Sequence, residues 1–216
     1  MLDLSYIPYK SRRNIKINNK ELLDLLNLHS TEAFFKSNPK LNDQKINLEI
    51  GFGSGEFILQ QAKQNPEEIF FGCEVYNHGV IKLLHNIQRN NLKNIFVCNI
   101  DVREFLLNLP KEILFNNIYI YYPDPWPKKK HNKRRLISGN FLEFLLNKFQ
   151  KNLCITTDHK DYAESILYQA LLLPSYYIDT MLISNNQKLH TKFEKKAIMN
   201  KSNIFNFILK HSNESR

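Results

Sequence analysis

The sequence predicts an α/β protein built on one mostly parallel, Rossmann-like sheet with helices on both faces. From Ile46 onward, short apolar segments alternate with amphipathic ones. The apolar segments are nearly continuous, which is typical of strands buried on both faces of a parallel sheet. Acidic residues or glycines stand at the ends of the first five of these segments. Ligands of such sheets bind beyond the carboxyl ends of the strands, so these residues form the candidate site.

Seven segments are expected to be strands: residues 46–50, 69–75, 94–100, 117–122, 153–157, 176–182 and 204–209. Helices are expected at 56–64, 78–90, 136–149 and 162–172, and Asp101 is expected to open a short helix that ends at Pro110. Residues 46–216 are therefore read as the main domain. Residues 1–45 are read as a basic arm with a short helix at 21–28, which is either a flap over the site or a poorly ordered, solvated tail.

The charge of the chain indicates a polyanionic partner. A chain of 216 residues has room for one well-cored domain, and its net charge of +9 and pI of about 9.3 favour nucleic acid. A merely basic surface is the alternative. We expect a cytoplasmic protein, because no apolar run approaches the ~18 residues of a membrane span and the N-terminus lacks a signal pattern. Cys73, Cys98 and Cys154 are expected to be buried, inert thiols.

A glycine-rich turn follows the first expected strand, with glycines at positions 51, 53 and 55. The sixth position counted from Gly51 is Glu56, so a dinucleotide fingerprint is absent, and no Gly-Lys-Ser/Thr follows to make a P-loop. Glycines allow a ligand to approach the backbone closely. The flanking Glu49 suits a cation such as an ammonium or sulfonium group. A generic strand-to-helix turn with a charge at the strand edge is the alternative.

Two further acids extend this pattern. Glu74 ends the second expected strand, where a carboxylate is placed to accept hydrogen bonds from ribose hydroxyls. Asp101 ends the third, near the expected position of an adenine edge, although it could be only a helix N-cap. A cation, a ribose and an adenine without a phosphate together describe S-adenosylmethionine. No metal site is expected, because His78 and His85 have no further ligand near them in the sequence.

The stretch 118–135 joins a strand, a stiff turn and a basic run. Prolines at 123, 125 and 127 surround Asp124 and the single tryptophan, Trp126. Six of the eight residues from 128 to 135 are Lys or Arg. A carboxylate on a rigid loop beside a phosphate-binding run suggests chemistry on a nucleic acid. Trp126 could stack on a base or pack beneath the loop, and the basic run could be only a solvated face.

These residues resemble the bacterial tRNA (guanine-N7-)-methyltransferases of the TrmB type. The resemblance is carried by residues 48–55, 72–75, 99–101, 122–135, 157–159 and 191–194, in family order. The Pro-Asp-Pro-Trp block with its basic run is its most specific part. The sequence departs from the family pattern at Lys130, Tyr121, Tyr122 and Val102. The resemblance implies a class I S-adenosylmethionine-dependent methyltransferase domain that methylates a guanosine in the variable loop of tRNA.

The resemblance also implies a role for each matching residue. Asp124 would be catalytic. Cofactor contacts would come from Glu49, Gly51, Gly53, Gly55, Glu74, Asp101 and Asp124. The target nucleotide would be held by Lys128, Asp158, Thr191, Lys192, Phe193 and Glu194. RNA contacts would come from Lys130, His131, Asn132, Lys133, Arg134 and Arg135. The expected partner is tRNA, with no membrane and no obligate protein partner, and the chain would be a monomer or homodimer.

The chemistry needs no proton abstraction, because guanine N7 already carries an in-plane lone pair. Rate enhancement must come from alignment of nitrogen, methyl and sulfur and from a fixed negative charge near the developing cation. Asp124 and Asp158 suit that task, and we favour positioning over general-base action. A methyltransferase of the same fold acting on another RNA, and a non-catalytic RNA-binding module, are the alternatives.

Overall fold

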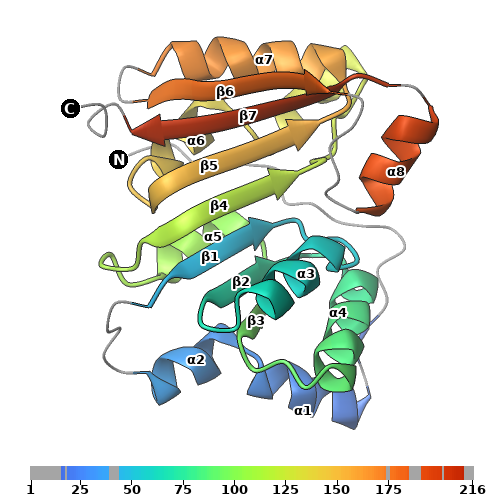
Figure 1. Cartoon of the computed structure of the whole chain (residues 1–216), viewed down its shortest axis with the longest axis vertical. Helices are drawn as coiled ribbons and strands as arrows, with labels where there is room; N and C mark the ends of the chain where they lie inside the picture. The colour runs from blue at the N-terminus through green and yellow to red at the C-terminus, as the bar shows by residue number, and fades with distance from the viewer. Residues whose placement is uncertain are drawn as a thin grey trace. The chain divides into compact units, whose positions relative to one another are not determined.

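The computed structural model describes residues 16–17, 19–38, 44–173, 176–184, 191–200 and 202–211. Strands within these ranges form a seven-stranded sheet with the order β3-β2-β1-β4-β5-β7-β6 (Figure 1). The paired strands described here run parallel except β7, which is antiparallel to β5 and to β6. The predicted mostly parallel seven-stranded sheet is confirmed. The chain divides into two compact units, Pro8–Pro110 and one that contains Lys111–Arg216.

The Pro8–Pro110 unit holds three parallel strands and the helices that connect them. The strands are β1 (Ile46–Ile50), β2 (Ile69–Cys73) and β3 (Ile95–Cys98), and the helices are α3 (Glu56–Gln64), α4 (Asn77–Arg89) and α5 (Val102–Asn108). All five residues of β1 are buried, as expected for a strand covered on both faces. Apolar residues of α3 and α4 pack with Phe70, Ile95 and Val97 in one buried core. β2 and β3 end before Glu74 and Asp101, which therefore stand just beyond the strand ends.

Two helices precede β1, where the sequence predicts one. They are α1 (Lys20–Leu28) and α2 (Thr31–Ser37), capped by the side chains of Asn19 and Ser30. Between them the His29 carbonyl accepts a hydrogen bond of 2.6 Å from Val97 N, and Ser30 forms a parallel bridge with Val97. The buried Phe34 packs edge-on against Phe71 and Phe96. α1 thus packs against α4 and α2 against β3, so residues 20–37 are not a solvated tail. Residues 1–15 lie outside the described part.

The other unit holds the remaining strands. These are β4 (Phe115–Tyr121), β5 (Phe149–Thr157), β6 (Tyr176–Ser184) and β7 (Ile204–His211). Its helices are α6 (Gly139–Leu145), α7 (Lys160–Leu171) and α8 (Lys192–Met199), with a 3-10 helix, η1 (Lys129–Arg134), after β4. α7 packs against β5 and β6, and α8 lies before β7 in the chain (Figure 1). β4 and β5 are parallel neighbours, so residues 122–124 and 158 emerge at the same edge.

The predicted helix at 136–149 is wrong at both ends. α6 begins only at Gly139, after Ser138 caps it, and ends at Leu145. Phe149 instead opens β5 and pairs with Phe115 of β4, with both rings buried. A short apolar run does not distinguish a buried helix from a buried strand, and strand pairing decided this one.

The three cysteines are free thiols, but they differ in burial. Cys73 and Cys98 are buried, while Cys154 is partly exposed, which corrects the prediction for that residue. Burial raises the pKa of each thiol above its usual range. All three therefore stay protonated at neutral pH and are poor nucleophiles. Within the described residues, no helix is long and apolar enough to cross a membrane.

Candidate active site

The glycine turn after β1 needs glycine at each of its three positions. Gly51, Gly53 and Gly55 have φ values of 71°, 55° and 74°, a region that other residues rarely adopt. At Gly55, which begins α3, a Cβ would also lie 2.7 Å from Leu83 Cδ1. At Gly51 a Cβ would meet nothing within 4 Å, so the backbone there faces open space. The turn therefore leaves its first glycine accessible to a ligand, as the sequence predicts.

Glu49 lies on β1 just before this turn and is a buried carboxylate. It is 5% exposed, and its Oε2 has no hydrogen-bond partner among the described residues. Burial, with smaller contributions from the charges of Glu74 and Glu56, raises the pKa of Glu49 to about 8. A backbone hydrogen bond with Ile58 partly offsets this rise, and a cationic donor at Oε2 would complete the carboxylate.

Glu74 is held by the backbone of the same unit. Its Oε2 accepts from Gly53 N at 2.8 Å, and its Oε1 accepts from Val75 N and Tyr76 N at 2.8 and 2.9 Å. These bonds tie the glycine turn to the end of β2 and fix the direction of the carboxylate. A carboxylate has about four lone-pair positions, so room for a ribose hydroxyl remains.

Asp101 caps α5, the alternative role left open by the sequence. Its Oδ1 accepts from Arg103 N at 2.9 Å, and its Oδ2 pairs with the Arg103 guanidinium at 3.4 Å. Asn99, which directly follows β3, donates from Nδ2 to the Glu74 carbonyl at 2.8 Å. The contact of Asp101 with an adenine stays a prediction.

The unit thus fits a cationic, phosphate-free nucleoside. A buried carboxylate with one unpartnered oxygen, a turn open at Gly51 and the acids after β2 and β3 would repel a pyrophosphate and suit an ammonium or sulfonium. S-adenosylmethionine has those groups.

The loop after β4 carries the predicted catalytic Asp124. The loop begins and turns at two strained positions, Tyr122 with φ of 50° and Trp126 with φ of 42°. Asp124 is exposed, and its Oδ1 accepts from Trp126 N at 3.2 Å. This short turn orients the carboxylate while leaving it open to solvent. Strained backbone of this kind persists where surrounding structure holds it, often at functional loops.

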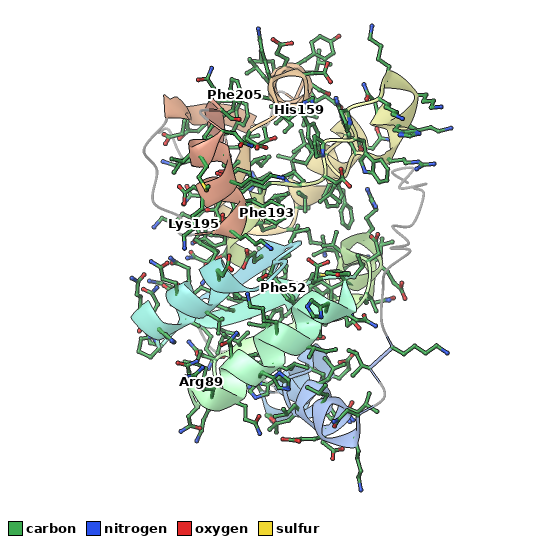
Figure 2. The ribbon with its side chains drawn as sticks, turned by 90° about the vertical axis from the view of Figure 1, so that its right-hand side faces the viewer. Phe52, Arg89, His159, Phe193, Lys195 and Phe205 are labelled. Carbon is green, nitrogen blue, oxygen red and sulfur yellow. The ribbon has the colours of Figure 1, made fainter. Side chains whose placement is uncertain are left out.

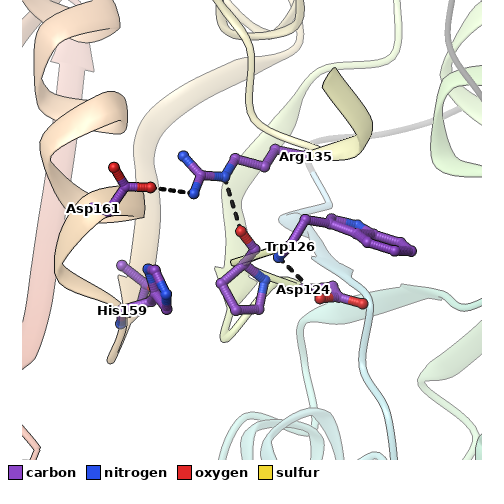
Figure 3. A network of polar contacts seen from close by, with 7 residues as sticks. Asp124, Trp126, Arg135, His159 and Asp161 are labelled. Carbon is purple, nitrogen blue, oxygen red and sulfur yellow. Dashed lines mark hydrogen bonds and ion pairs between the residues drawn. The ribbon is translucent and has the colours of Figure 1, made fainter. Parts of the chain in front are cut away.

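Arg135 anchors this loop through a hydrogen bond and an ion pair, a role that the sequence did not predict. Arg135 is 6% exposed, its Nε donates to the Pro125 carbonyl at 2.8 Å, and its Nη2 pairs with Asp161 of α7 (Figure 3). Its guanidinium also lies 4.8 Å from the centre of the Tyr162 ring. The predicted RNA contact of Arg135 stays untested. The signal in the sequence for this ion pair was Asp161, an acid at the start of the helix that follows Asp158.

The other members of the basic run form the 3-10 helix and its flanks. Lys128, Lys130, Lys133 and Arg134 are exposed. Arg134 lies over the Trp126 ring at 5.0 Å, and His131 meets the same ring edge-on at 5.7 Å. Desolvation, together with the charges of Arg134, Lys130 and Lys128, lowers the pKa of His131. Trp126 therefore packs with the basic turn, and its stacking on a base stays a prediction.

A third group of predicted residues lies at the start of α8. Thr191 caps the helix by accepting from Glu194 N at 3.1 Å. Glu194 is 2% exposed, and its Oε1 has no partner in the described part of the chain. Phe193 is 53% exposed and stacks on Tyr122 with ring centres 6.2 Å apart. Figure 2 shows Phe193 and Lys195 on α8. The structure therefore brings Phe193 to Tyr122 at the end of β4, and leaves Lys192 and Asp158 exposed.

The sheet order and strand-end acids define a class I methyltransferase. Solved structures share this fold: an antibiotic-resistance methyltransferase, Kmr, has a TM-score of 0.57 and 12% identity, covering 84% of this chain and 92% of that one. An rRNA methylase from Streptococcus thermophilus has a TM-score of 0.55 and 11% identity, covering 91% and 99%.

A family model described as "Putative methyltransferase" matches residues 43–207. The tRNA (guanine-N(7)-)-methyltransferase of Wolbachia pipientis wMel is 40% identical over 161 residues, covering 73% of this chain and 72% of the relative. That of Neorickettsia sennetsu is 35% identical over 188 residues, covering 85% and 83%. The chain belongs to the tRNA (guanine-N7-)-methyltransferase family.

Proposed function

We propose that this chain transfers the methyl group of S-adenosylmethionine to N7 of a guanosine in the variable loop of tRNA. The observation that carries the proposal is its 40% identity to a curated tRNA (guanine-N(7)-)-methyltransferase over 73% of the chain. A net charge of +9 supports a tRNA partner, and we place the protein in the cytoplasm, where tRNA is modified.

The Pro8–Pro110 unit supplies the cofactor contacts in this proposal. S-adenosylmethionine supplies an electrophilic methyl on a sulfonium sulfur. Glu49, whose Oε2 lacks a partner among the described residues, accepts from the cationic amino-acid end of the cofactor. Glu74, held by three backbone N–H groups, receives the ribose hydroxyls. Asp101 receives the adenine edge, and the turn at Gly51, Gly53 and Gly55 lets the cofactor approach the backbone.

The loop and α8 of the other unit position the guanine. Asp124, fixed by its turn to Trp126 N, orients the base and offsets the positive charge that develops as N7 is alkylated. No proton leaves the nucleophile, so no general base is required. Lys128, Asp158 and residues 191–194 hold the nucleotide. Residues 130–134 contact phosphates, whereas the buried Arg135 holds the loop through the Pro125 carbonyl and Asp161.

The test is methyl transfer from labelled S-adenosylmethionine to bulk tRNA, followed by mapping of the modified base. Label on N7 of a variable-loop guanine is expected. Label on another atom or another RNA would replace the proposal with a different methyltransferase activity. Binding of tRNA without transfer would indicate a non-catalytic module.

One variant and its control test whether Asp124 acts in catalysis or only in tRNA binding. Asp124→Ala should lower kcat by about 100-fold or more while tRNA binding persists, as removal of a single electrostatic group does at other catalytic sites. Glu143→Gln, an exposed acid on α6, should leave kcat unchanged. Loss of tRNA affinity in Asp124→Ala, without a change in kcat at saturation, would make the loop a docking element.

A further inference from the structure

The hydroxyl group of Tyr122 is buried without a hydrogen-bond partner among the described residues. Tyr122 directly follows β4, and its N–H donates to the Thr156 carbonyl of β5 at 2.8 Å. Its backbone is held at a φ of 50°, which an aromatic residue seldom adopts. The chain therefore fixes this ring at the strand end, immediately before the loop of Asp124. A buried hydroxyl without a partner lowers the stability of the fold, and a ligand that accepts from it would offset that cost.

The ring and the hydroxyl face two different kinds of neighbour. The ring stacks on Phe193, with an interplanar angle of 21°. Burial, and then the negative charges of Glu194 and Asp158, raise the pKa of Tyr122 above its usual range. The phenol is therefore neutral at physiological pH and carries a proton to donate.

Glu194 is the second unsatisfied group of this cluster. Its Oε1 is buried and has no partner in the described residues, while its backbone N–H is already used by the Thr191 cap. The cluster thus combines one neutral donor, Tyr122, with two carboxylates, Glu194 and Asp158. All three come from the same compact unit, as does the exposed ring of Phe193.

We propose that the Tyr122 hydroxyl is a specificity-determining group that donates a hydrogen bond to O6 of the target guanine. The Watson–Crick edge of guanine presents one acceptor, O6, and two donors, N1–H and the N2 amino group. One phenol and two carboxylates match these groups in number and kind, with Glu194 and Asp158 accepting from N1–H and N2–H. Adenine presents an unprotonated N1 and no N2 amino group, so it would leave both carboxylates without a donor, and its N6 amino group would force the phenol to accept instead of donate. The inference rests on the proposed function and adds a residue to it.

The test compares Tyr122→Phe with the wild-type chain on two tRNAs, one with guanosine and one with 6-thioguanosine at the target position. Sulfur is a weak acceptor, so it removes the partner of the hydroxyl and keeps the other edge groups. We expect Tyr122→Phe to lose about 10-fold or more in kcat/KM on guanosine. The wild-type chain should lose a similar factor on 6-thioguanosine, and the variant should lose nothing further from the sulfur.

Two controls distinguish a loss of guanine recognition from a loss of folding stability. The Tm of Tyr122→Phe should equal or exceed that of the wild type, because the hydroxyl has no partner to lose among the described residues. Tyr168→Phe, which removes an exposed hydroxyl from α7, should keep the wild-type kcat/KM. Equal kcat/KM for Tyr122→Phe and wild type, or a full additional loss on 6-thioguanosine, would overturn the inference. Absence of transfer by the wild-type chain would instead overturn the proposed function.

Discussion

At the scale of single residues, each compact unit holds a buried carboxylate that is incompletely hydrogen-bonded among the described residues. Glu49 and Glu194 are buried carboxylates, each with one oxygen lacking a partner in the described residues. Stability is lost at such positions, and they persist where a ligand completes them. The two differ in the ligand they suit. Glu49 stands before a glycine turn and suits a cation, whereas Glu194 stands beside a phenol and suits the edge of a base.

Glu49 gives the free protein a pH dependence that can be measured. Burial raises its pKa to about 8, so the folded state binds this proton more tightly than the unfolded chain. The stabilising contribution is therefore full below the unfolded pKa and is lost as the pH rises through about 8. Glu49→Gln should be more stable than the wild type at pH 8, by on the order of a few kcal/mol, and similar to it near pH 4.5. Urea unfolding across this range measures the difference.

The same proton should leave when the cofactor product binds. S-adenosylhomocysteine retains the ammonium group, which favours ionised Glu49. Calorimetry in two buffers of different ionisation enthalpy at pH 7 should show release of close to one proton by the wild type and near zero by Glu49→Gln. Glu67→Gln, an exposed acid of the same unit, is the matched control and should behave as the wild type. Equal proton release by wild type and Glu49→Gln would place the ammonium elsewhere.

At the scale of elements, the stretch after β4 divides into a buried arginine that holds the loop and an exposed basic surface. Arg135 is buried between the Pro125 carbonyl and Asp161, whereas Lys133 and its neighbours on the 3-10 helix are exposed. Adjacent cations of one run thus have different environments. The sequence shows that Arg135 and Lys133 are both cations, but only the ion pair of Arg135 with Asp161 of α7 shows that Arg135 is the buried one.

Arg135→Gln should therefore impair catalysis, and Lys133→Gln should impair the binding of tRNA phosphates. Loss of Arg135 should lower kcat by about 10-fold or more, because a loop displaced by an ångström misaligns the reacting atoms. The salt dependence of tRNA binding should stay as in the wild type. Loss of Lys133 should leave kcat at saturation unchanged and reduce the slope of log K against log[salt] by about one. A reduced slope in Arg135→Gln would identify it as a phosphate contact.

At the scale of the whole molecule, the sequence predicted most of the sheet and part of the site. Parallel strands place their carboxyl ends at one edge, so the positions of Glu49, Glu74 and Asp101 at the ends of β1, β2 and β3 could be predicted, while their cofactor contacts stay a prediction. The unpartnered hydroxyl of Tyr122 beside Phe193 was not predictable. Its ring meets α8 only because β7 returns antiparallel beside β5, a pairing that local periodicity does not encode. The second helix, α2, was missed for the same reason, since its burial depends on Phe34 packing against β2 and β3.

Methylation at guanine N7 is the central claim, and a single atom of the substrate tests it. Two tRNAs would be compared, one with guanosine and one with 7-deazaguanosine at the target position, where a carbon replaces N7. The methyl group should be transferred to the first and not to the second, while both bind the protein with similar affinity, because the Watson–Crick edge and the phosphates are unchanged. Equal transfer to the 7-deazaguanosine tRNA would contradict the claim.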